Sequence, residues 1–229
     1  MKNRCFELRR GEFGVPDYSN EGRIGINGFA KQQPNKCMKR QRSKSPAPLK
    51  IVFMDVAPAN WPADLGTIAP ETFRQCGFAL GTLLDQRSGL ISLFNAEILP
   101  DFCRALRNAD LVVGYNCLSF DRNIIAGAGG RIGSVRWLDL MEQIFRATNR
   151  SVPLSALLEV NFGIHSGVSL RKHRRWIKEQ NRIQLAAKCI NGVVGMLRIY
   201  HWVCQQGKLR IPSEEKKSEE IPIAWQPIN

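Results

Sequence analysis

Apolar residues recur along the chain with two different spacings, and the alternation between them outlines the fold. Residues 51–56 form a nearly continuous apolar run, which is typical of a strand covered on both faces. Every second residue from Cys76 to Leu84 suits one buried sheet face, and the Asp85–Gly89 segment supplies a turn after it. On these grounds strands are predicted at residues 51–56, 74–84, 90–94, 111–115 and 136–138.

Helical spacing occupies much of the sequence between and after these runs. Ile98, Leu99, Phe102 and Leu106 form one apolar stripe at helical intervals. The same reasoning predicts helices at residues 96–107, 139–148, 152–161 and 181–206, and a helix that carries Asp121 with Ser119 as its N-cap. Asp139 is interpreted as an N-cap rather than a metal ligand. A hairpin followed by alternating strands and helices predicts an α/β domain with a mixed sheet flanked by helices.

The composition changes at both ends of this patterned region. Residues 1–49 are rich in Lys, Arg, Gly, Asn and Pro and have little apolar periodicity, so we expect a basic, disordered N-terminal arm. Residues 50–212 form the predicted domain. Residues 213–229 begin with a run of Glu and Lys and are expected to be a charged flexible tail.

Charge and cysteine usage narrow the functional classes. The formal net charge is +13, which favours polyanionic partners such as nucleic acid, because binding releases condensed counterions. No apolar run approaches the roughly 20 residues that a membrane-spanning helix needs, so no membrane association is expected.

Seven widely spaced cysteines without a Cys-x-x-Cys pair argue against a disulfide framework or a zinc ribbon, and predict a reducing, cytoplasmic setting. Four of them lie among apolar residues and are expected in the core: Cys76, Cys103, Cys117 and Cys189.

Three segments, at residues 51–57, 109–121 and 187–193, occur in an informative order. They resemble the three active-site blocks of a 3′→5′ exonuclease of the DEDD type, and Gly-Tyr-Asn-x-x-x-Phe-Asp at residues 114–121 is the most specific of them. Over residues 51–211 the chain resembles the ribonuclease-H-like exonuclease domain that is predicted beside bacterial DEAD/DEAH-type helicases. The resemblance implies a ribonuclease-H-like fold and a helicase as a partner.

The resemblance also implies which residues would form the active site. Such a site holds two divalent cations with four carboxylates, and these ions stabilise the attacking and leaving oxygens of a phosphoryl displacement. Asp55 and Asp121 match two of the carboxylates. Ala57 stands at the position of the family's Glu, Lys188 at its Tyr and Gly192 at its last Asp. Asp55 and Asp121 are therefore expected to be vestigial catalytic residues and weak metal ligands. No cofactor is expected, with Mg²⁺ or Mn²⁺ required for any activity that survives.

A short basic segment precedes the last predicted helix. Arginine can grip phosphate with two hydrogen bonds, and a tryptophan ring can stack on a base. The candidate nucleic-acid-binding residues are Arg171, Lys172, Arg174, Arg175, Trp176 and Lys178. The alternative interpretation is a solvated basic face with Trp176 in the core.

Together these features favour an inactive exonuclease-like pseudoenzyme that binds nucleic acid, with a single strand as the favoured form. Two alternatives stay open at this point. One is a protein-interaction or structural pseudo-nuclease, and the other is an active metal-dependent nuclease with an unusual ligand set.

Overall fold

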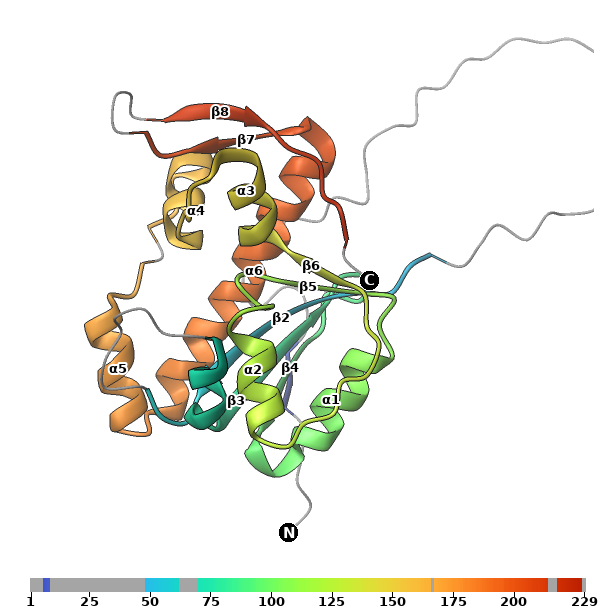
Figure 1. The fold of residues 1–229 in the computed structure, drawn as a ribbon, viewed down its shortest axis with the longest axis vertical. Coiled ribbons are helices and arrows are strands. Elements are labelled where there is room, and N and C mark those ends of the chain that lie inside the picture. The colour runs from blue at the N-terminus through green and yellow to red at the C-terminus, as the bar shows by residue number, and fades with distance from the viewer. Residues whose placement is uncertain (1–5, 9–47, 62–69, 166, 214–217, 228–229) are drawn as a thin grey trace, which may run out of the picture.

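A computed structural model describes residues 6–8, 48–61, 70–165, 167–213 and 218–227. Its centre is a mixed six-stranded sheet with the strand order β1-β4-β3-β2-β5-β6 (Figure 1). β2 lies antiparallel to β3 and parallel to β5, which confirms the predicted mixed sheet. The strands are β1 (Phe6–Leu8), β2 (Ile51–Pro58), β3 (Phe78–Asp85), β4 (Ile91–Asn95), β5 (Leu111–Gly114) and β6 (Trp137–Asp139).

Helices cover both faces of this sheet. They are η1 (Pro70–Cys76), η2 (Ala96–Ile98), α1 (Leu99–Arg107), α2 (Asp121–Gly127), α3 (Leu140–Thr148), α4 (Leu154–Phe162), α5 (Leu170–Lys178) and α6 (Arg182–Gln206). Val52, Met54 and Val56 of β2 share one apolar cluster with α1 and α2. Phe53 points to the opposite face, where its cluster includes residues of α6. β2 is thus buried on both sides, as its continuous apolar run predicts.

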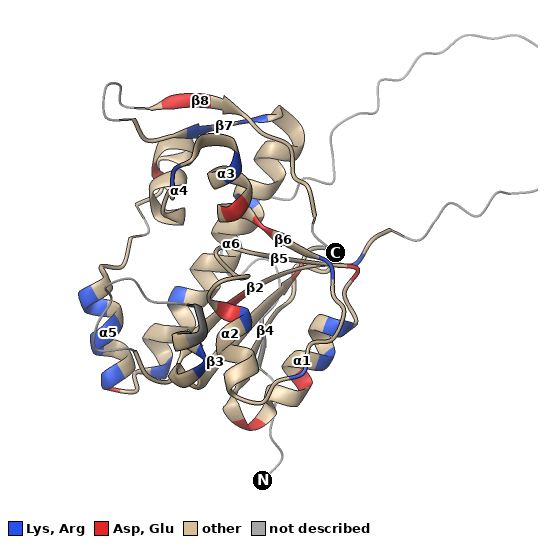
Figure 2. Ribbon diagram, viewed as in Figure 1, with Lys and Arg blue, Asp and Glu red and all other residues tan. Residues whose placement is uncertain are grey.

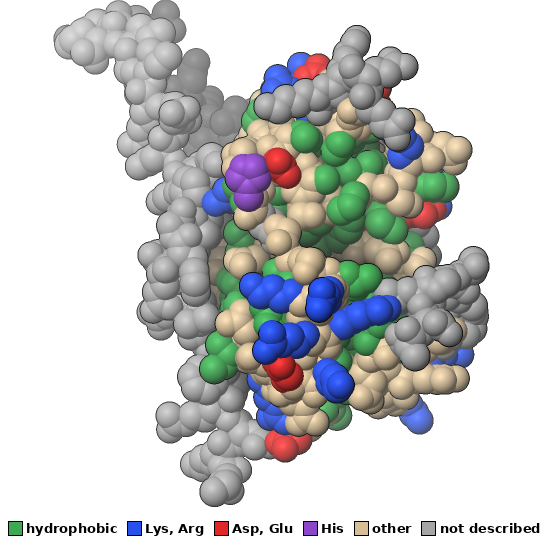
Figure 3. All heavy atoms as spheres, turned by 90° about the vertical axis from the view of Figure 1, so that its left-hand side faces the viewer, with side chains coloured by type: hydrophobic (Ala, Val, Ile, Leu, Met, Phe, Trp, Pro, Cys, Tyr) green, Lys and Arg blue, Asp and Glu red, His purple; other side chains and the backbone are tan. Residues whose placement is uncertain are grey.

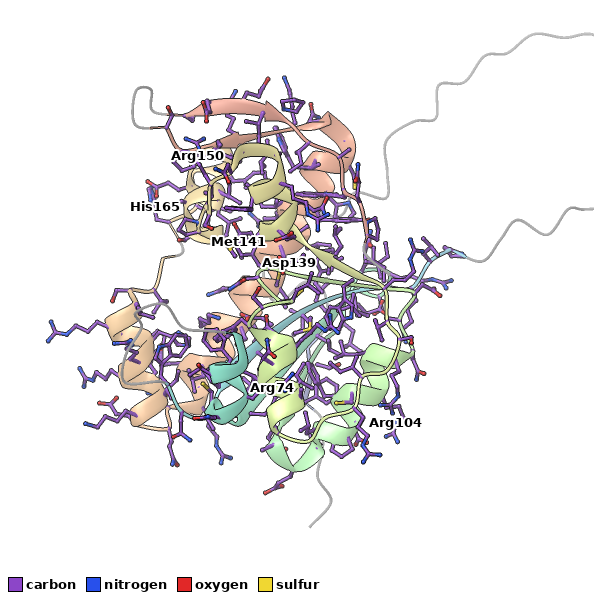
Figure 4. The ribbon with its side chains drawn as sticks, in the orientation of Figure 1. Arg74, Arg104, Asp139, Met141, Arg150 and His165 are labelled. Carbon is purple, nitrogen blue, oxygen red and sulfur yellow. The ribbon has the colours of Figure 1, made fainter. Side chains whose placement is uncertain are left out.

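Two predicted element boundaries were wrong. Residues 74–76 were expected to begin a strand, but they end the 3₁₀ helix η1. Gly77, with φ of +65°, then turns the chain into β3. The predicted strand therefore began too early, because the apolar alternation included Cys76, which lies before the turn. Ser119 is not the N-cap of α2, which begins at Asp121 after Phe120 and has no side-chain cap. The prediction for Asp139 is confirmed, because its Oδ1 accepts hydrogen bonds from the amides of Met141 and Glu142 (Figure 4).

A hairpin of β7 (Lys208–Ile211) and β8 (Glu219–Pro222) packs beside α3 and α4. β8 comes from the stretch expected to be a flexible tail. Ile223 after it is only 7% exposed, and Glu219 forms an ion pair with Arg150. The packed domain therefore extends beyond residue 213, because the apolar residues that follow the charged run complete the cluster around α6.

Three further sequence expectations concern the ends, the cysteines and the membrane. Of the expected N-terminal arm, the structure describes β1, which pairs with β4, and residues 48–49, while residues 1–5 and 9–47 lie outside the described part. The four cysteines predicted in the core are buried and free. Among the described residues, no helix combines the length and apolar character that crossing a membrane requires.

Candidate functional site

The predicted site residues converge where β2, the start of α2 and the middle of α6 meet. Asp55 lies on β2, on the strand face that also carries Phe53 and is turned toward α6. Lys188 of α6 reaches this carboxylate: its Nζ lies 3.0 Å from Oδ2 and 3.4 Å from Oδ1. Only 15% of the Asp55 side chain and 29% of the Lys188 side chain are exposed, so the ion pair is largely shielded from water.

Gly192 lies one helical turn after Lys188 and faces the same carboxylate. A Cβ atom at Gly192 would lie 2.6 Å from Oδ2 of Asp55. Any side chain there would force the carboxylate to move, so the absence of a Cβ lets α6 pack directly against Asp55.

Asp121 comes to the same place from the first turn of α2. It is 2% exposed, and its Oδ1 accepts a 2.9 Å hydrogen bond from the amide of Val56, the residue after Asp55. Burial and the nearby Asp55 raise the pKa of Asp121 well above its usual range, although Lys188 and the Val56 hydrogen bond act in the opposite direction. The fold therefore joins the two carboxyl groups that the sequence placed 66 positions apart.

Ala57 lies next to the site and contributes an apolar surface to it. It is fully buried in a cluster that contains Trp176, Ile177, Leu185 and Cys189. The position at which the resemblance expects a glutamate is thus part of a packed apolar contact, without room for a longer polar side chain.

The described residues do not fit a two-metal centre. They contain no group of three or more His, Cys, Asp or Glu side chains that could hold an ion. Asp139, the next carboxylate along the sheet edge, accepts hydrogen bonds from the amides of Asn116 and Leu118 as well as capping α3. Asp55 forms an ion pair with Lys188, and the positive charge of this ammonium would repel a metal ion bound next to it.

A cavity of about 220 Å³ opens beside the ion pair. Sequence reasoning missed it, because its residues come from α4, α5, α6 and the segment before α5. His173, which was not among the candidate site residues, also lines this cavity. His173 is 8% exposed, and its Nε2 has no hydrogen-bond partner among the described residues. Burial, and then the charge of Lys188, lower the pKa of His173 to about 4.

The predicted basic segment forms α5, whose cations line one side of the molecule (Figure 2). In the space-filling view they gather into one basic surface (Figure 3). Arg174 is partly buried and Trp176 is 8% exposed, within the cluster around Ala57. The Trp176 ring therefore belongs to the core in this structure, with the Nζ of Lys172 5.2 Å from its centre. The exposed cations of this surface are Arg171, Lys172, Arg175, Lys178 and Arg182, and we call it the α5 surface.

Comparisons with known proteins bear on the fold. No protein-family model and no curated protein matches the chain. Among solved structures, the family B DNA polymerase from the hyperthermophilic archaeon Pyrobaculum calidifontis is similar, with a TM-score of 0.52 and 17% sequence identity. The match covers 69% of this chain and 25% of the polymerase chain. At this identity the likeness concerns the fold alone, and with the sheet order above it supports a ribonuclease-H-like α/β fold with a mixed sheet flanked by helices.

Proposed function

We propose that this domain binds single-stranded nucleic acid and does not hydrolyse it. The observation that carries the proposal is the ion pair between Lys188 and Asp55 at 3.0 Å. In a DEDD-type exonuclease, which the sequence resembles, the matching aspartate is a metal ligand. Here the amine of Lys188 lies against the matching carboxylate instead. Burial lowers the pKa of Lys188, but Asp55, Cys189 and Asp121 together raise it above its usual value, so the amine is protonated.

The loss of hydrolysis follows from the ligand set. Two-metal phosphoryl transfer needs both ions held close together by several carboxylates. Asp55 and Asp121 supply two carboxyl groups, while Ala57 and Gly192 offer no ligand atom. A divalent cation would also have to displace Lys188 against its attraction to Asp55. Mg²⁺ or Mn²⁺ chemistry is therefore not expected to operate at this site.

The binding half of the proposal is supported by charge and its placement. The α5 surface presents five exposed cations, and its helix also borders the cavity through His173. Exposed arginine and lysine side chains can follow a phosphate backbone, and each phosphate contact releases counterions. The affinity should therefore fall steeply as the salt concentration rises.

Two variants of equal charge loss test the binding. Fluorescence anisotropy would follow end-labelled single strands of DNA and RNA. The test variant combines Arg171→Gln, Lys172→Gln and Arg175→Gln on the α5 surface. The control combines Arg87→Gln, Arg104→Gln and Arg146→Gln, which are exposed cations on other elements. We expect at least tenfold weaker binding and a shallower salt dependence for the first variant alone. Equal losses in both variants, or no binding by the wild type, would refute the α5 surface as the binding site.

Digestion of the same strands tests the inactivity. With Mg²⁺ or Mn²⁺ present we expect no release of nucleotides, and no difference between the wild type and Asp55→Ala. Release that stops with EDTA and with Asp55→Ala would show an active nuclease instead. A helicase partner and a cytoplasmic setting, which the sequence suggests, remain parts of the proposal that co-purification and fractionation would test.

A further inference from the structure

The cavity beside Lys188 has the size and walls of a site for a small ring system. Its volume of about 220 Å³ lies below the roughly 300–1,000 Å³ of pockets for drug-sized ligands. Leu154, Leu158 and Val168 give it apolar walls. Polar groups interrupt these walls, and they come from Ser155, His173, Lys188 and Asn191.

The charge inside the cavity disfavours a phosphate. Among the lining residues, all of which the structure describes, Lys188 is the single cation at neutral pH. Its ammonium is held by both oxygens of Asp55, so the pair brings little net charge to a ligand. A phosphate in the cavity would meet the Asp55 carboxylate nearby without an unpaired cation to compensate it. A neutral ligand meets no such penalty.

The hydrogen-bonding groups suit a nitrogen heterocycle. Nε2 of His173 is buried without a partner among the described residues, and a buried polar atom in this state costs free energy until a ligand or water satisfies it. Imidazole can donate or accept at this nitrogen, depending on its tautomer. The Asn191 side chain adds a paired donor and acceptor, the combination that amides use on the edges of bases.

Helix α5 contributes to both the cavity and the α5 surface. His173 of α5 lines the cavity, whereas its neighbours Lys172 and Arg175 are exposed and belong to the α5 surface. Resting on the proposed function, we propose that the cavity takes one unstacked nucleobase of a bound single strand while the α5 surface holds the adjoining phosphates. The aromatic face of the base would pack on Leu158 and Val168, and its edge would meet His173 and Asn191.

Base-dependent binding distinguishes this inference from the proposed function. Anisotropy would compare an ordinary labelled strand with an abasic strand of equal length and charge. We expect the wild type to bind the ordinary strand about tenfold more tightly. Val168→Phe, which fills the cavity, and Asn191→Ala should reduce this preference while leaving the affinity for the abasic strand unchanged. Gln184→Ala, another exposed amide of α6, is the matched control and should alter neither. Thermal unfolding would establish that each variant is folded.

The outcomes separate the two proposals. Tight binding without a preference for bases would overturn the cavity assignment and keep the α5 surface. Nucleosides and inorganic phosphate would be titrated separately into ¹⁵N-labelled protein. Chemical shift changes at His173 and Asn191 with nucleosides alone support the cavity, even if no strand binds to α5. Changes with phosphate alone would overturn the inference, and so would the absence of changes with either probe.

Discussion

Gly192 faces Asp55 so closely that a Cβ atom on the glycine would lie 2.6 Å from the carboxylate oxygen Oδ2. The position where the resemblance expects an aspartate is therefore next to the carboxylate with which that aspartate would share a metal. The structure brings Asp55, Asp121 and Gly192 together, and Gly192 has no side-chain atom that could bind a metal. Lys188, one turn earlier on α6, forms an ion pair with Asp55.

Removing the lysine should expose the cost of the unpaired carboxylate. Lys188→Met leaves Asp55 largely buried beside Asp121 without its counter-ion. Breaking a buried pair typically costs about 3–5 kcal/mol, and this pair is partly exposed, so we expect a loss of about 2 kcal/mol in the free energy of unfolding. Urea denaturation at pH 7 measures it. The double variant Asp55→Asn, Lys188→Met should recover most of the loss. Equal stability of Lys188→Met and the wild type would show that the ion pair does not form in solution.

Replacing Asp121 should stabilise the protein at neutral pH. The pKa of the Asp121 carboxyl is higher in the folded state than its unfolded value of 3.8. Its contribution to the free energy of unfolding is therefore fully present below pH 3.8 and is lost as the pH rises through the folded pKa. Asp121→Asn keeps an oxygen acceptor for the Val56 amide and carries no charge. We therefore expect a melting temperature that exceeds the wild-type value increasingly above about pH 4. A variant less stable than the wild type at pH 7 would mean that the charged carboxylate is needed.

The sequence predicted this site only in part, for reasons that the structure explains. The strand of Asp55 and the helix of Lys188 follow from local periodicity, but their contact spans 133 positions and depends on how α6 crosses the sheet. The identification of Gly192 as a vacant ligand position came from the resemblance and not from spacing. His173 was missed although a local signal exists. It precedes Trp176 by three residues and Ile177 by four, so helical spacing puts all three on the buried face of α5. Trp176 could be assigned to the core only once its neighbours Leu185 and Cys189 were in place.

His173 should make the stability depend on pH in a defined window. Its folded pKa is about 4, below the ordinary 6.5, so its contribution is fully present above pH 6.5 and is lost as the pH falls toward 4. In this pH range the unfolded chain binds a proton at His173 and the folded chain does not. The free energy of unfolding should therefore fall by a few kcal/mol as the pH drops through the window. His173→Phe should flatten this part of the stability curve. His165→Asn is the control, since His165 is mostly exposed (Figure 4), and it should leave the curve unchanged. Identical curves for the wild type and His173→Phe would contradict the buried, neutral state of His173.

Restoring ligands tests whether the vacant positions are correctly assigned. Lys188→Tyr with Gly192→Asp removes the competing cation and adds a third carboxyl group beside Asp55 and Asp121. Ala57→Glu would complete the set, but it places a carboxylate in a fully buried apolar cluster, and we expect it to cost several kcal/mol of stability. The test therefore leaves Ala57 unchanged. Calorimetry should detect Mn²⁺ uptake by the double variant Lys188→Tyr, Gly192→Asp and none by the wild type. Lys188→Tyr with Gly192→Asn has nearly the same shape without the added charge and should bind at least tenfold more weakly. If the folded double variant takes up no Mn²⁺, then Gly192 does not occupy the ligand position, and the site did not derive from a metal centre of this geometry.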